Sequence, residues 1–455
     1  MTAPYRQLRP HLAVFALAWL AGYAMAAPAV SPDQLARGQY LVRAGDCASC
    51  HTAHQGKPFA GGRPIATPFG VIFSTNITPD QQTGIGQWTE KQFYGALHDG
   101  VDDEGHHLYP AMPYPWYTQV SRADVDAIQA YLGTVTPVSQ EARPVKLPWP
   151  LSWRGSLAGW NMLYFDAGTY RPDAGRSPQW NRGAYLVEGL GHCSACHTPK
   201  NVLGAIKKDE SLEGGSANLH WFAPGLGGNL RDGVGNWSKA EIVAYLKTGA
   251  NLKSASVGPM TEVVMNSTQY LTTADLDAIA TYLKQRPSAP SKSAPEVAAL
   301  GADALARGQA LYIDNCIACH MDDGRGVARV FPPLAGSSAI QADDAGTVVH
   351  VVLSGSRMAA PASRPTGLAM PAFGWKFDDA QMVDVVNYIR HAWGNRASTI
   401  DADLVRAVRK DIQPGDSPSR DAVNVRADAH ARPALWDVDE DPHLRPRAPA
   451  PVKGH

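Results

Sequence analysis

Cys47-Ala48-Ser49-Cys50-His51 is the first of three pentapeptides with one pattern, in which two cysteines are separated by two residues and followed directly by histidine. The pattern returns at Cys193-Ser194-Ala195-Cys196-His197 and at Cys316-Ile317-Ala318-Cys319-His320. These motifs contain all six cysteines of the 455-residue chain. The rest of the sequence repeats around them, so they decide how the chain is divided.

Each motif lies in a block with the same order of features. An Arg-Gly pair precedes the first cysteine by 10, 11 and 9 residues, with the arginine at Arg37, Arg182 and Arg307. Apolar residues at helical spacing, such as Leu35 and Leu41, predict a short opening helix in each block. A closing helix is predicted near residues 124–132, 275–283 and 382–389.

A glycine follows each of these arginines, at Gly38, Gly183 and Gly308. Glycine is a poor helix former, but its missing side chain allows another helix to approach closely. We therefore predict that the opening helix crosses the closing helix at this glycine. A tyrosine of the closing helix is expected nearby, at Tyr131, Tyr282 or Tyr388.

Helix-start signals support this plan in blocks one and two. Ser121 with Asp124, and Thr272 with Asp275, predict capped starts of the closing helices. Both blocks also carry a capping box for a middle helix, in the stretches 88–92 (WTEKQ) and 237–241 (WSKAE). Block three lacks this tryptophan and is the most diverged of the three.

The N-terminus predicts an export signal. Arg6 and Arg9 precede an apolar run from about His11 to Met25, and small residues follow at a cleavage site around Ala26. A membrane anchor is the alternative, but the run is shorter than the ~20 apolar residues that a spanning helix needs. We predict that residues 1–26 are a cleaved signal peptide.

Two segments lie outside the blocks. Residues 139–179, here called the aromatic linker, are too apolar for a flexible connection and are expected to pack between domains or against a partner. Their aromatic residues include Trp149, Trp153, Trp160, Tyr164, Phe165 and Tyr170. Residues 396–455 form a polar, Pro-rich tail, which begins with a possible amphipathic helix containing Leu404, Val405 and Val408.

Composition sets only broad limits. The chain is 44% hydrophobic and 18% charged, as in globular proteins, and its 42 glycines and 35 prolines predict many ordered turns. The formal net charge of -1 argues against a nucleic-acid partner.

The repeated pentapeptide is the attachment signal for haem c. Both thiols add to the vinyl groups of the haem, and the adjacent histidine binds the iron from one side. A zinc site would need a second cysteine pair or more histidines at set spacing, and a redox dithiol needs no following histidine. We therefore predict three covalent haems, attached through Cys47 and Cys50, Cys193 and Cys196, and Cys316 and Cys319, with His51, His197 and His320 as iron ligands.

Methionine is the expected second iron ligand. Elimination leaves Met112 for block one, Met260 or Met265 for block two, and Met358 or Met370 for block three. We select Met112, Met260 and Met370, which adjoin prolines and follow the motif histidine by 61, 63 and 50 residues. Core filling is the alternative for each methionine, and His98, His106 and His107 are rival ligands in block one.

Two filled axial positions favour electron transfer over oxygen chemistry. No nucleophile–base arrangement or pair of carboxylates stands out, so no catalytic residue is assigned. Substrate chemistry is expected on another protein.

Three such motifs behind an export signal resemble the triheme cytochrome c subunits of bacterial membrane-bound dehydrogenases. These subunits partner alcohol, gluconate, sorbitol, fructose, aldehyde or N-heterocycle dehydrogenases. The stretches 68–80 (PFGVIFSTNITPD) and 107–114 (HLYPAMPY) are similar to the first domain of that family, and 331–336 (FPPLAG) is similar to the loop of single-haem cytochromes. The resemblance covers about residues 31–395.

This resemblance implies a mainly α fold of three tandem class I cytochrome c domains. We place them at residues 31–138, 180–286 and 299–395, between the signal peptide, the aromatic linker and the tail. Family members often end in apolar amphipathic helices that rest on the membrane, whereas the tail after Pro414 is polar.

The resemblance also implies a role. A catalytic partner oxidises a small substrate at a flavin, PQQ or molybdenum cofactor, and electrons pass through the three haems to ubiquinone or a terminal oxidase. The chain is then a periplasmic electron-transfer subunit without enzyme activity, held peripherally at the outer face of the cytoplasmic membrane. A free periplasmic multihaem carrier is the main alternative. A haem peroxidase would need an open iron.

Overall fold

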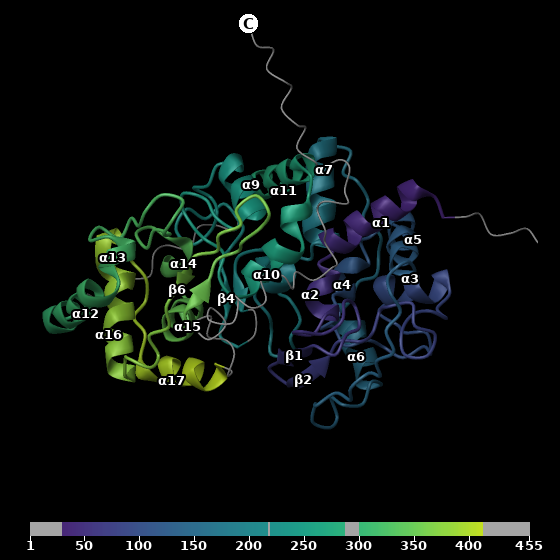
Figure 1. Cartoon of the computed structure of the whole chain (residues 1–455), viewed down its shortest axis with the longest axis horizontal. Coiled ribbons are helices and arrows are strands. Elements are labelled where there is room, and N and C mark those ends of the chain that lie inside the picture. The colour runs from purple at the N-terminus through teal and green to yellow at the C-terminus, as the bar shows by residue number, and fades with distance from the viewer. Residues whose placement is uncertain (1–29, 217–218, 287–299, 413–455) are drawn as a thin grey trace, which may run out of the picture.

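The computed structural model describes residues 30–216, 219–286 and 300–412. The predicted signal peptide 1–26 and the tail from residue 413 lie outside the described residues. Within them the chain is mainly helical, as predicted, with three small two-stranded antiparallel sheets. Three groups of helices follow one another along the molecule (Figure 1). None of the helices in this described part has the length and apolar character needed to cross a bilayer.

The first group forms one end of the molecule. Its elements are α1 (Pro32–Ala44), α2 (Cys47–His51), β1 (Pro64–Thr67), β2 (Gly70–Phe73), α3 (Glu90–His98), α4 (Tyr114–Tyr117) and α5 (Arg122–Leu132). The predicted capping box of the middle helix is present, because Thr89 and Gln92 cap α3 reciprocally. The Ser121 hydroxyl accepts from the Asp124 amide at the start of α5, which confirms the predicted cap.

The second group occupies the middle, after the linker helix α6 (Ser156–Tyr164). Its elements are α7 (Pro178–Ala184), the π-helix η1 (Tyr185–Leu190), α8 (Ser194–His197), η2 (Lys208–Glu210), β3 (Gly215–Ser216), β4 (Phe222–Ala223), α9 (Lys239–Thr248), α10 (Pro259–Asn266), η3 (Thr268–Tyr270) and α11 (Thr273–Gln285). The predicted caps are again present, with Ser238 and Glu241 on α9 and Thr272 on α11.

The third group forms the other end (Figure 1). Its elements are α12 (Ala302–Asn315), α13 (Ile317–His320), α14 (Ser338–Gln341), α15 (Gly346–Ser354), β5 (Ser356–Arg357), β6 (Ala369–Met370), α16 (Asp379–His391), η4 (Ala392–Gly394) and α17 (Ala402–Asp411). The possible helix at the start of the tail is α17. Its Val405 and Val408 are fully buried against α15 and α16, so the packed third group continues beyond residue 395.

All three predicted helix crossings are present. A Cβ on Gly38 would lie 2.0 Å from the Ala127 carbonyl oxygen of α5. At Gly183 the corresponding distance is 2.1 Å to the oxygen of Ala278, and at Gly308 it is 2.3 Å to the oxygen of Asp384. The predicted closing-helix tyrosines are also beside these glycines, since their Cβ atoms lie within 2.8 Å of the added carbon. Glycine is therefore required at each crossing.

The second opening helix contains one residue more than the first between its arginine and its cysteine, 11 against 10. The π-helix η1 accommodates this residue, and the Gly191 amide donates to the carbonyl of Leu186, five residues earlier. A π-turn holds one more residue than an α-turn. The second motif therefore keeps its place relative to the crossing.

The apolar core has two separate parts. The first and second groups share one cluster, in which Leu41, Val125, Leu186 and Leu276 are almost completely buried. The third group has its own cluster around Tyr312, Met382 and Val386. Two groups thus form one hydrophobic unit, and the third forms another.

Reciprocal hydrogen bonds join the first and second groups. The Tyr40 hydroxyl donates to Asp275 of the second group (2.5 Å), and the Tyr185 hydroxyl donates to Asp124 of the first group (2.6 Å). Each carboxylate also binds the arginine of its own opening helix, Arg182 or Arg37. Burial raises the pKa of both tyrosines to about 12, with the neighbouring carboxylates adding to the effect.

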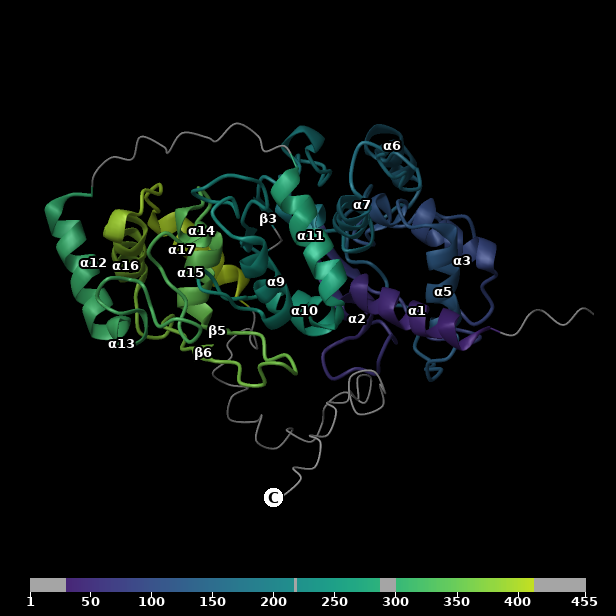
Figure 2. The same ribbon diagram turned by 90° about the horizontal axis from the view of Figure 1, so that it is seen from above.

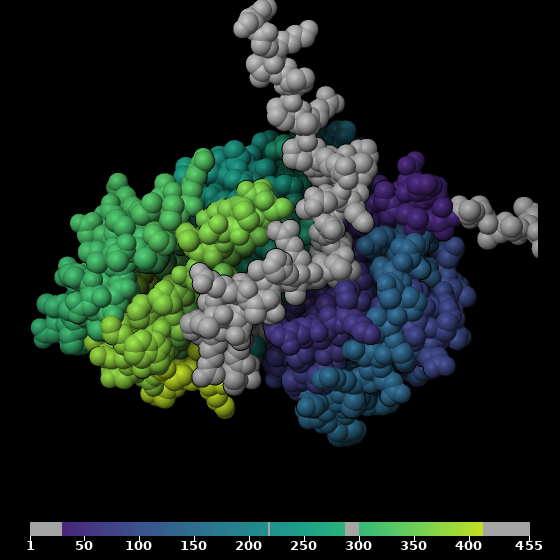
Figure 3. Space-filling model, viewed as in Figure 1, coloured from purple at the N-terminus to yellow at the C-terminus, as the bar shows by residue number. Residues whose placement is uncertain are grey.

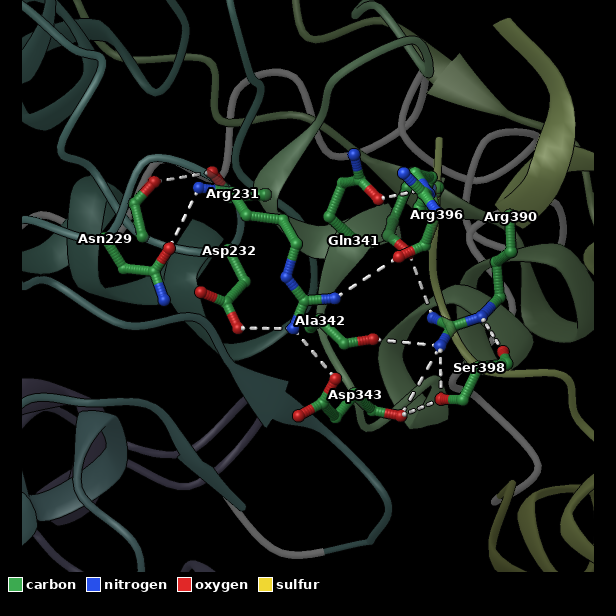
Figure 4. A network of polar contacts seen from close by, with 12 residues as sticks. Asn229, Arg231, Asp232, Gln341, Ala342, Asp343, Arg390, Arg396 and Ser398 are labelled. Atoms are coloured by element: carbon green, nitrogen blue, oxygen red, sulfur yellow. Dashed lines mark hydrogen bonds and ion pairs between the residues drawn. The ribbon is translucent and has the colours of Figure 1, made fainter. Parts of the chain in front are cut away.

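A polar network joins the second and third groups (Figure 4). Arg231 of the second group pairs with Asp343 (2.9 Å) and donates to the carbonyl oxygen of Arg396 (3.3 Å). Behind it, the fully buried Arg390 donates to the carbonyl oxygens of Ile340, Ala342, Asp343 and Ser398. Burial lowers the pKa of Arg390 to about 10, so this guanidinium stays charged at neutral pH.

The aromatic linker packs along the first group and reaches the second. The Tyr109 hydroxyl donates to the Leu151 carbonyl, and the Tyr114 hydroxyl donates to Asn161 (2.5 Å). The indole of Trp160 donates to the Leu203 carbonyl of the second group (3.1 Å). The predicted packing between blocks is therefore present.

Candidate haem sites

Each cysteine motif forms a single helical turn at the end of an opening helix. α2 begins at Cys47, and α8 and α13 follow directly after Cys193 and Cys316. Residues three apart lie on one face of a helix, so both sulfur atoms of a motif can face one planar group. No disulfide joins any of the six cysteines, all of which lie in the described residues.

Burial makes these thiols poor nucleophiles. It raises the pKa of Cys47 and Cys193 to about 12 and that of Cys50 and Cys316 to about 11. Redox-active Cys-x-x-Cys pairs instead have pKa values lowered to about 7 or below. The motifs therefore do not have the electrostatics of a dithiol oxidoreductase.

Each of the three motif histidines makes the same kind of hydrogen bond, from Nδ1 to a backbone carbonyl oxygen. Nδ1 of His51 lies 2.7 Å from the Thr75 carbonyl oxygen, and Nδ1 of His197 lies 2.7 Å from that of Pro224. Nδ1 of His320 lies 3.0 Å from the Pro332 carbonyl oxygen. A carbonyl only accepts, so Nδ1 carries the proton and the lone pair is on Nε2. Metal-binding histidines are oriented by such outer hydrogen bonds.

The same three imidazoles are neutral. Burial lowers the pKa of His51, His197 and His320, and the carbonyl hydrogen bond opposes this effect only in part. Histidine must be deprotonated at one nitrogen to bind a metal. Burial and the carbonyl therefore prepare each ring as an Nε2 ligand.

The surroundings of the first two motifs include a large, half-open cavity. Within the described ranges, no three His, Cys, Asp or Glu side chains come together in a group that could hold a metal ion. A cavity of about 2050 Å³ reaches Cys50 of the first motif and Cys196 of the second. The motif histidines and the selected methionines do not line this cavity.

The candidate methionines of blocks one and two lie on or next to short helices of their own groups. Met112 precedes α4 and packs, partly buried, against the shared core. Met260 is the second residue of α10, after Gly258 with a φ of 51°. The alternative, Met265, has its sulfur 3.2 Å from the Ala360 amide of the third group. Met265 therefore contacts the third group.

In block three the two candidate methionines have different surroundings. Met370 lies in β6 and packs against the third core together with Cys316 and Ile317. Met358 instead lines a small hollow with Asn251 and Leu252 of the second group.

The rival histidines of block one have other contacts. Nδ1 of His98 lies 2.7 Å from Asp99, and its ring stacks on Tyr94. His106 is exposed near Asp102 and Glu104. Nδ1 of His107 lies 3.2 Å from the side-chain amide of Asn161 in the linker. These contacts match surface and linker roles.

Each of the first two motifs is contacted by a side chain of the other group, and the sequence did not single these side chains out. The Trp116 indole donates to Ser194 inside the second motif (2.5 Å). Asn266 of the second group donates to Ser49 inside the first motif (2.8 Å). Arg63 donates to the Ser49 carbonyl oxygen (2.5 Å) and pairs with Glu262 (2.8 Å). The two attachment turns are thus held at one junction.

Comparison with known proteins agrees with this geometry. The cytochrome c family model matches residues 35–136 and 305–393. The chain is 43% identical over 396 residues to the gluconate 2-dehydrogenase cytochrome c subunit of Pantoea cypripedii, covering 82% of this chain and 89% of the relative. It is 40% identical over 390 residues to the cytochrome c subunit of alcohol dehydrogenase (quinone) from Gluconobacter oxydans, covering 82% and 81%. The chain belongs to the family of dehydrogenase cytochrome c subunits.

As a cytochrome c subunit, the protein binds haem c covalently and transfers electrons in a dehydrogenase complex, without oxidising the substrate itself. A shorter relative is named a diheme cytochrome c-type protein, from Cereibacter sphaeroides. It is 36% identical over 298 residues, which cover 99% of that protein and 62% of this cytochrome c subunit. A two-haem protein therefore corresponds to less than two thirds of the present chain.

Proposed function

We propose that this cytochrome c subunit carries electrons through three covalent haems, from a dehydrogenase catalytic subunit to ubiquinone or a terminal oxidase. The observation that carries the proposal is the threefold repetition of a partly buried motif histidine whose Nδ1 is bound to a carbonyl. When bound, haem c accepts and releases one electron at its iron. The number of sites follows the number of such histidines.

We assign the residues of each site as predicted. Cys47, Cys50, Cys193, Cys196, Cys316 and Cys319 form the thioethers. His51, His197 and His320 bind one face of each haem, and Met112, Met260 and Met370 bind the other. The sites belong to three domains, at residues 31–138, 180–286 and 299–395.

The partner is proposed to dock on the aromatic linker. Trp149 and Met162 are each 82% exposed, and Trp153 and Leu163 are also exposed. Exposed apolar patches mark interaction sites. The inner side of α6, with Leu157 and Trp160, lines the cavity that reaches Cys50 and Cys196. A dehydrogenase subunit seated on this linker, at the lower edge of Figures 1 and 3, is therefore close to the first two sites.

The proposed location is the periplasm, at the outer face of the cytoplasmic membrane. The export signal at residues 1–26 and the extracytoplasmic chemistry of haem c attachment support it. The partner's own cofactor is of the flavin, PQQ or molybdenum type, as in the enzymes that the family serves.

Mass spectrometry of the mature chain tests the number of haems. Three haem masses are expected, and His197→Ala is expected to reduce the content to two. His98→Ala is the matched control and keeps all three, because His98 is bound to Asp99 and Tyr94. Free thiols or bound zinc in the mature chain would refute the assignment.

Redox titration tests the methionines. Met112→Ala and Met370→Ala are each expected to lower the potential of one haem and to open its iron to carbon monoxide. Met265→Ala and Met358→Ala serve as controls and leave all three low-spin spectra unchanged. The reverse pattern would exchange the assignments.

Purification from native membranes tests the partner. The chain is expected to copurify with a large dehydrogenase subunit, and Trp149→Ser with Trp153→Ser is expected to release it. A wild-type chain that is isolated alone would favour the free periplasmic carrier instead. Loss of membrane binding without loss of the dehydrogenase would make the linker a lipid contact.

A further inference from the structure

The second and third candidate sites are joined differently from the first and second. The attachment turns α2 and α8 meet through Trp116, Asn266 and Arg63, whereas α13 lies in the outer part of the third group (Figures 1 and 2). One of the contacts between the second and third groups is that of β4 with α15. This contact therefore lies between the two sites.

One short segment of the second group is bound to the motif histidine. The carbonyl oxygen of Pro224 is 2.7 Å from Nδ1 of His197. Pro224 directly follows β4, so only three peptide bonds separate it from Trp221. The hydrogen bond therefore fixes the orientation of the His197 ring relative to this segment.

The same segment is bound to α15 of the third group. The Phe222 amide donates to the Thr347 hydroxyl (2.7 Å), and this hydroxyl donates back to the Phe222 carbonyl (2.9 Å). One residue earlier, the Trp221 ring stacks on His350 with a centroid distance of 4.1 Å and an interplanar angle of 28°. His350 is 1% exposed, so the stack excludes water.

The helix α15 is buried on all sides apart from Val351. Val349 and Val352 belong to the third core, together with Cys316 and Met370. After the helix ends, Ser356 of β5 pairs with Met370 of β6. A helix that is buried around its whole circumference packs against protein on every side, whereas a surface helix has one face in solvent. α15 thus links the contact with β4 to the third site.

We propose that residues 221–224 and α15 form the electron-transfer route between the second and third haem sites, with the Trp221–His350 stack and the Phe222–Thr347 hydrogen bonds as its junction. The inference rests on the proposed function. One electron leaves the donating site, which is oxidised, and enters the accepting site, which is reduced. No bond forms or breaks, and no proton is transferred. Trp221, Thr347 and His350 act as positioning residues.

The test measures redistribution of one electron in the fully loaded chain. Laser-flash reduction delivers less than one electron per molecule, and freeze-quenched EPR follows each ferric haem. Trp221→Leu and His350→Leu are expected to slow exchange between the second and third haems several-fold. Trp221→Phe and His350→Phe keep two stacked rings and are expected to retain the wild-type rate.

Arg231→Met is the matched control. It removes the ion pair with Asp343 at the same junction but leaves the stack and the Thr347 hydrogen bonds intact. Exchange at the wild-type rate is expected. Equal slowing in Arg231→Met and His350→Leu would overturn the route, because loosening of the junction would then be the cause. Wild-type exchange in a Trp221→Leu, His350→Leu double variant would also overturn it.

Haem mass and midpoint potentials, measured on the same samples, separate this inference from the proposed function. Three attached haems with unchanged potentials and unchanged exchange refute only the route. Absence of haem from the wild-type chain refutes the function. A variant that loses one haem is replaced in the comparison by Thr347→Val, which removes the hydroxyl of the junction and leaves both rings in place.

Discussion

The junction between the first two groups and the junction between the last two are built from different chemistry. The first and second groups share an apolar core. Each also donates a tyrosine hydroxyl hydrogen bond to a carboxylate of the other, from Tyr40 to Asp275 and from Tyr185 to Asp124. The second and third groups keep separate cores and meet through Arg231, Asp343 and the buried Arg390. The first and second blocks therefore form a pair with a common core, and the third block packs beside them with a core of its own.

One position in the repeat accounts for much of this difference. The residue three after the opening arginine is Tyr40 in block one, Tyr185 in block two and Ala310 in block three. Ala310 is exposed, and its side chain has no hydroxyl that could donate a hydrogen bond to another group. The carboxylates follow the same pattern, since Asp384 of block three binds Arg307 alone. A block without this tyrosine cannot form the reciprocal tyrosine–carboxylate hydrogen bonds.

The largest effect is expected from filling a helix crossing. Gly183→Ala would place a carbon 2.1 Å from the oxygen of Ala278, and overpacking of this kind costs about 3 kcal/mol. Because the first two groups share one core, both should lose protection from proteolysis together. Gly308→Ala should expose the third group only. Limited proteolysis with mass spectrometry distinguishes the two patterns.

Gly159→Ala is the matched control for both variants, because an added Cβ there meets nothing within 4 Å. It should leave stability unchanged or slightly raised, as expected for glycine replaced in a helix. Independent loss of the first group in Gly183→Ala would contradict the shared core.

The next largest effect concerns the carboxylates. Asp275→Ala removes the acceptor of both Arg182 and Tyr40, and hydrogen bonds to a charged group contribute about 1.5–3 kcal/mol. Chemical denaturation should show this loss for the joint unfolding of the first two groups. Asp384→Ala removes the carboxylate that binds the opening-helix arginine of block three, although Asp384 lies at a different position of its closing helix. It should change stability little, because Arg307 lies in water and exposed ion pairs contribute little.

A smaller effect is expected from the tyrosine hydroxyls. Tyr40→Phe or Tyr185→Phe should each cost about 1 kcal/mol, the usual contribution of one hydrogen bond. Ala310→Tyr adds a hydroxyl at an exposed position and should leave stability unchanged. The double variant Tyr40→Phe, Asp275→Asn should lose less than the sum of its single variants, because the two residues share one interaction.

The smallest effect is expected on acidification. Burial tends to raise the pKa of Asp275, but the hydrogen bonds from Arg182 and Tyr40 and the charges of Arg182 and Arg37 outweigh it and lower that pKa. A lowered folded pKa gives stability that is full above the unfolded value of ~3.9 and is lost as the pH falls through the folded value. The first junction should therefore loosen in acid. Asp275→Asn should show a flatter acid limb in unfolding experiments at several pH values.

Features that follow from local chemistry could be predicted from the sequence. Glycine at a crossing, Ser or Thr at a cap and Cys-x-x-Cys-His each require particular residues at particular spacings, so Gly38, Thr89 and Cys47 were informative by themselves. The motif repeats also indicated the helical plan. These elements are determined within one block.

Features that depend on how blocks meet could not be predicted. The partner of Tyr40 is 235 residues away, and neither residue type indicates the other. The acceptors of the motif histidines are backbone carbonyls at offsets of 24, 27 and 12 residues, and a carbonyl leaves no signature in the residue type. The stack of Trp221 on His350 likewise joins two residues that appear unremarkable in their own blocks.

The π-helix η1 also affects how the second attachment motif is oriented. An insertion in an α-helix normally rotates every following side chain by about 100°. The wider turn at Tyr185–Leu190 accommodates the additional residue. The cysteines that follow therefore keep their rotational position about the helix axis relative to the crossing. The one-residue difference in length between the opening helices of blocks one and two is therefore absorbed before the attachment motif begins.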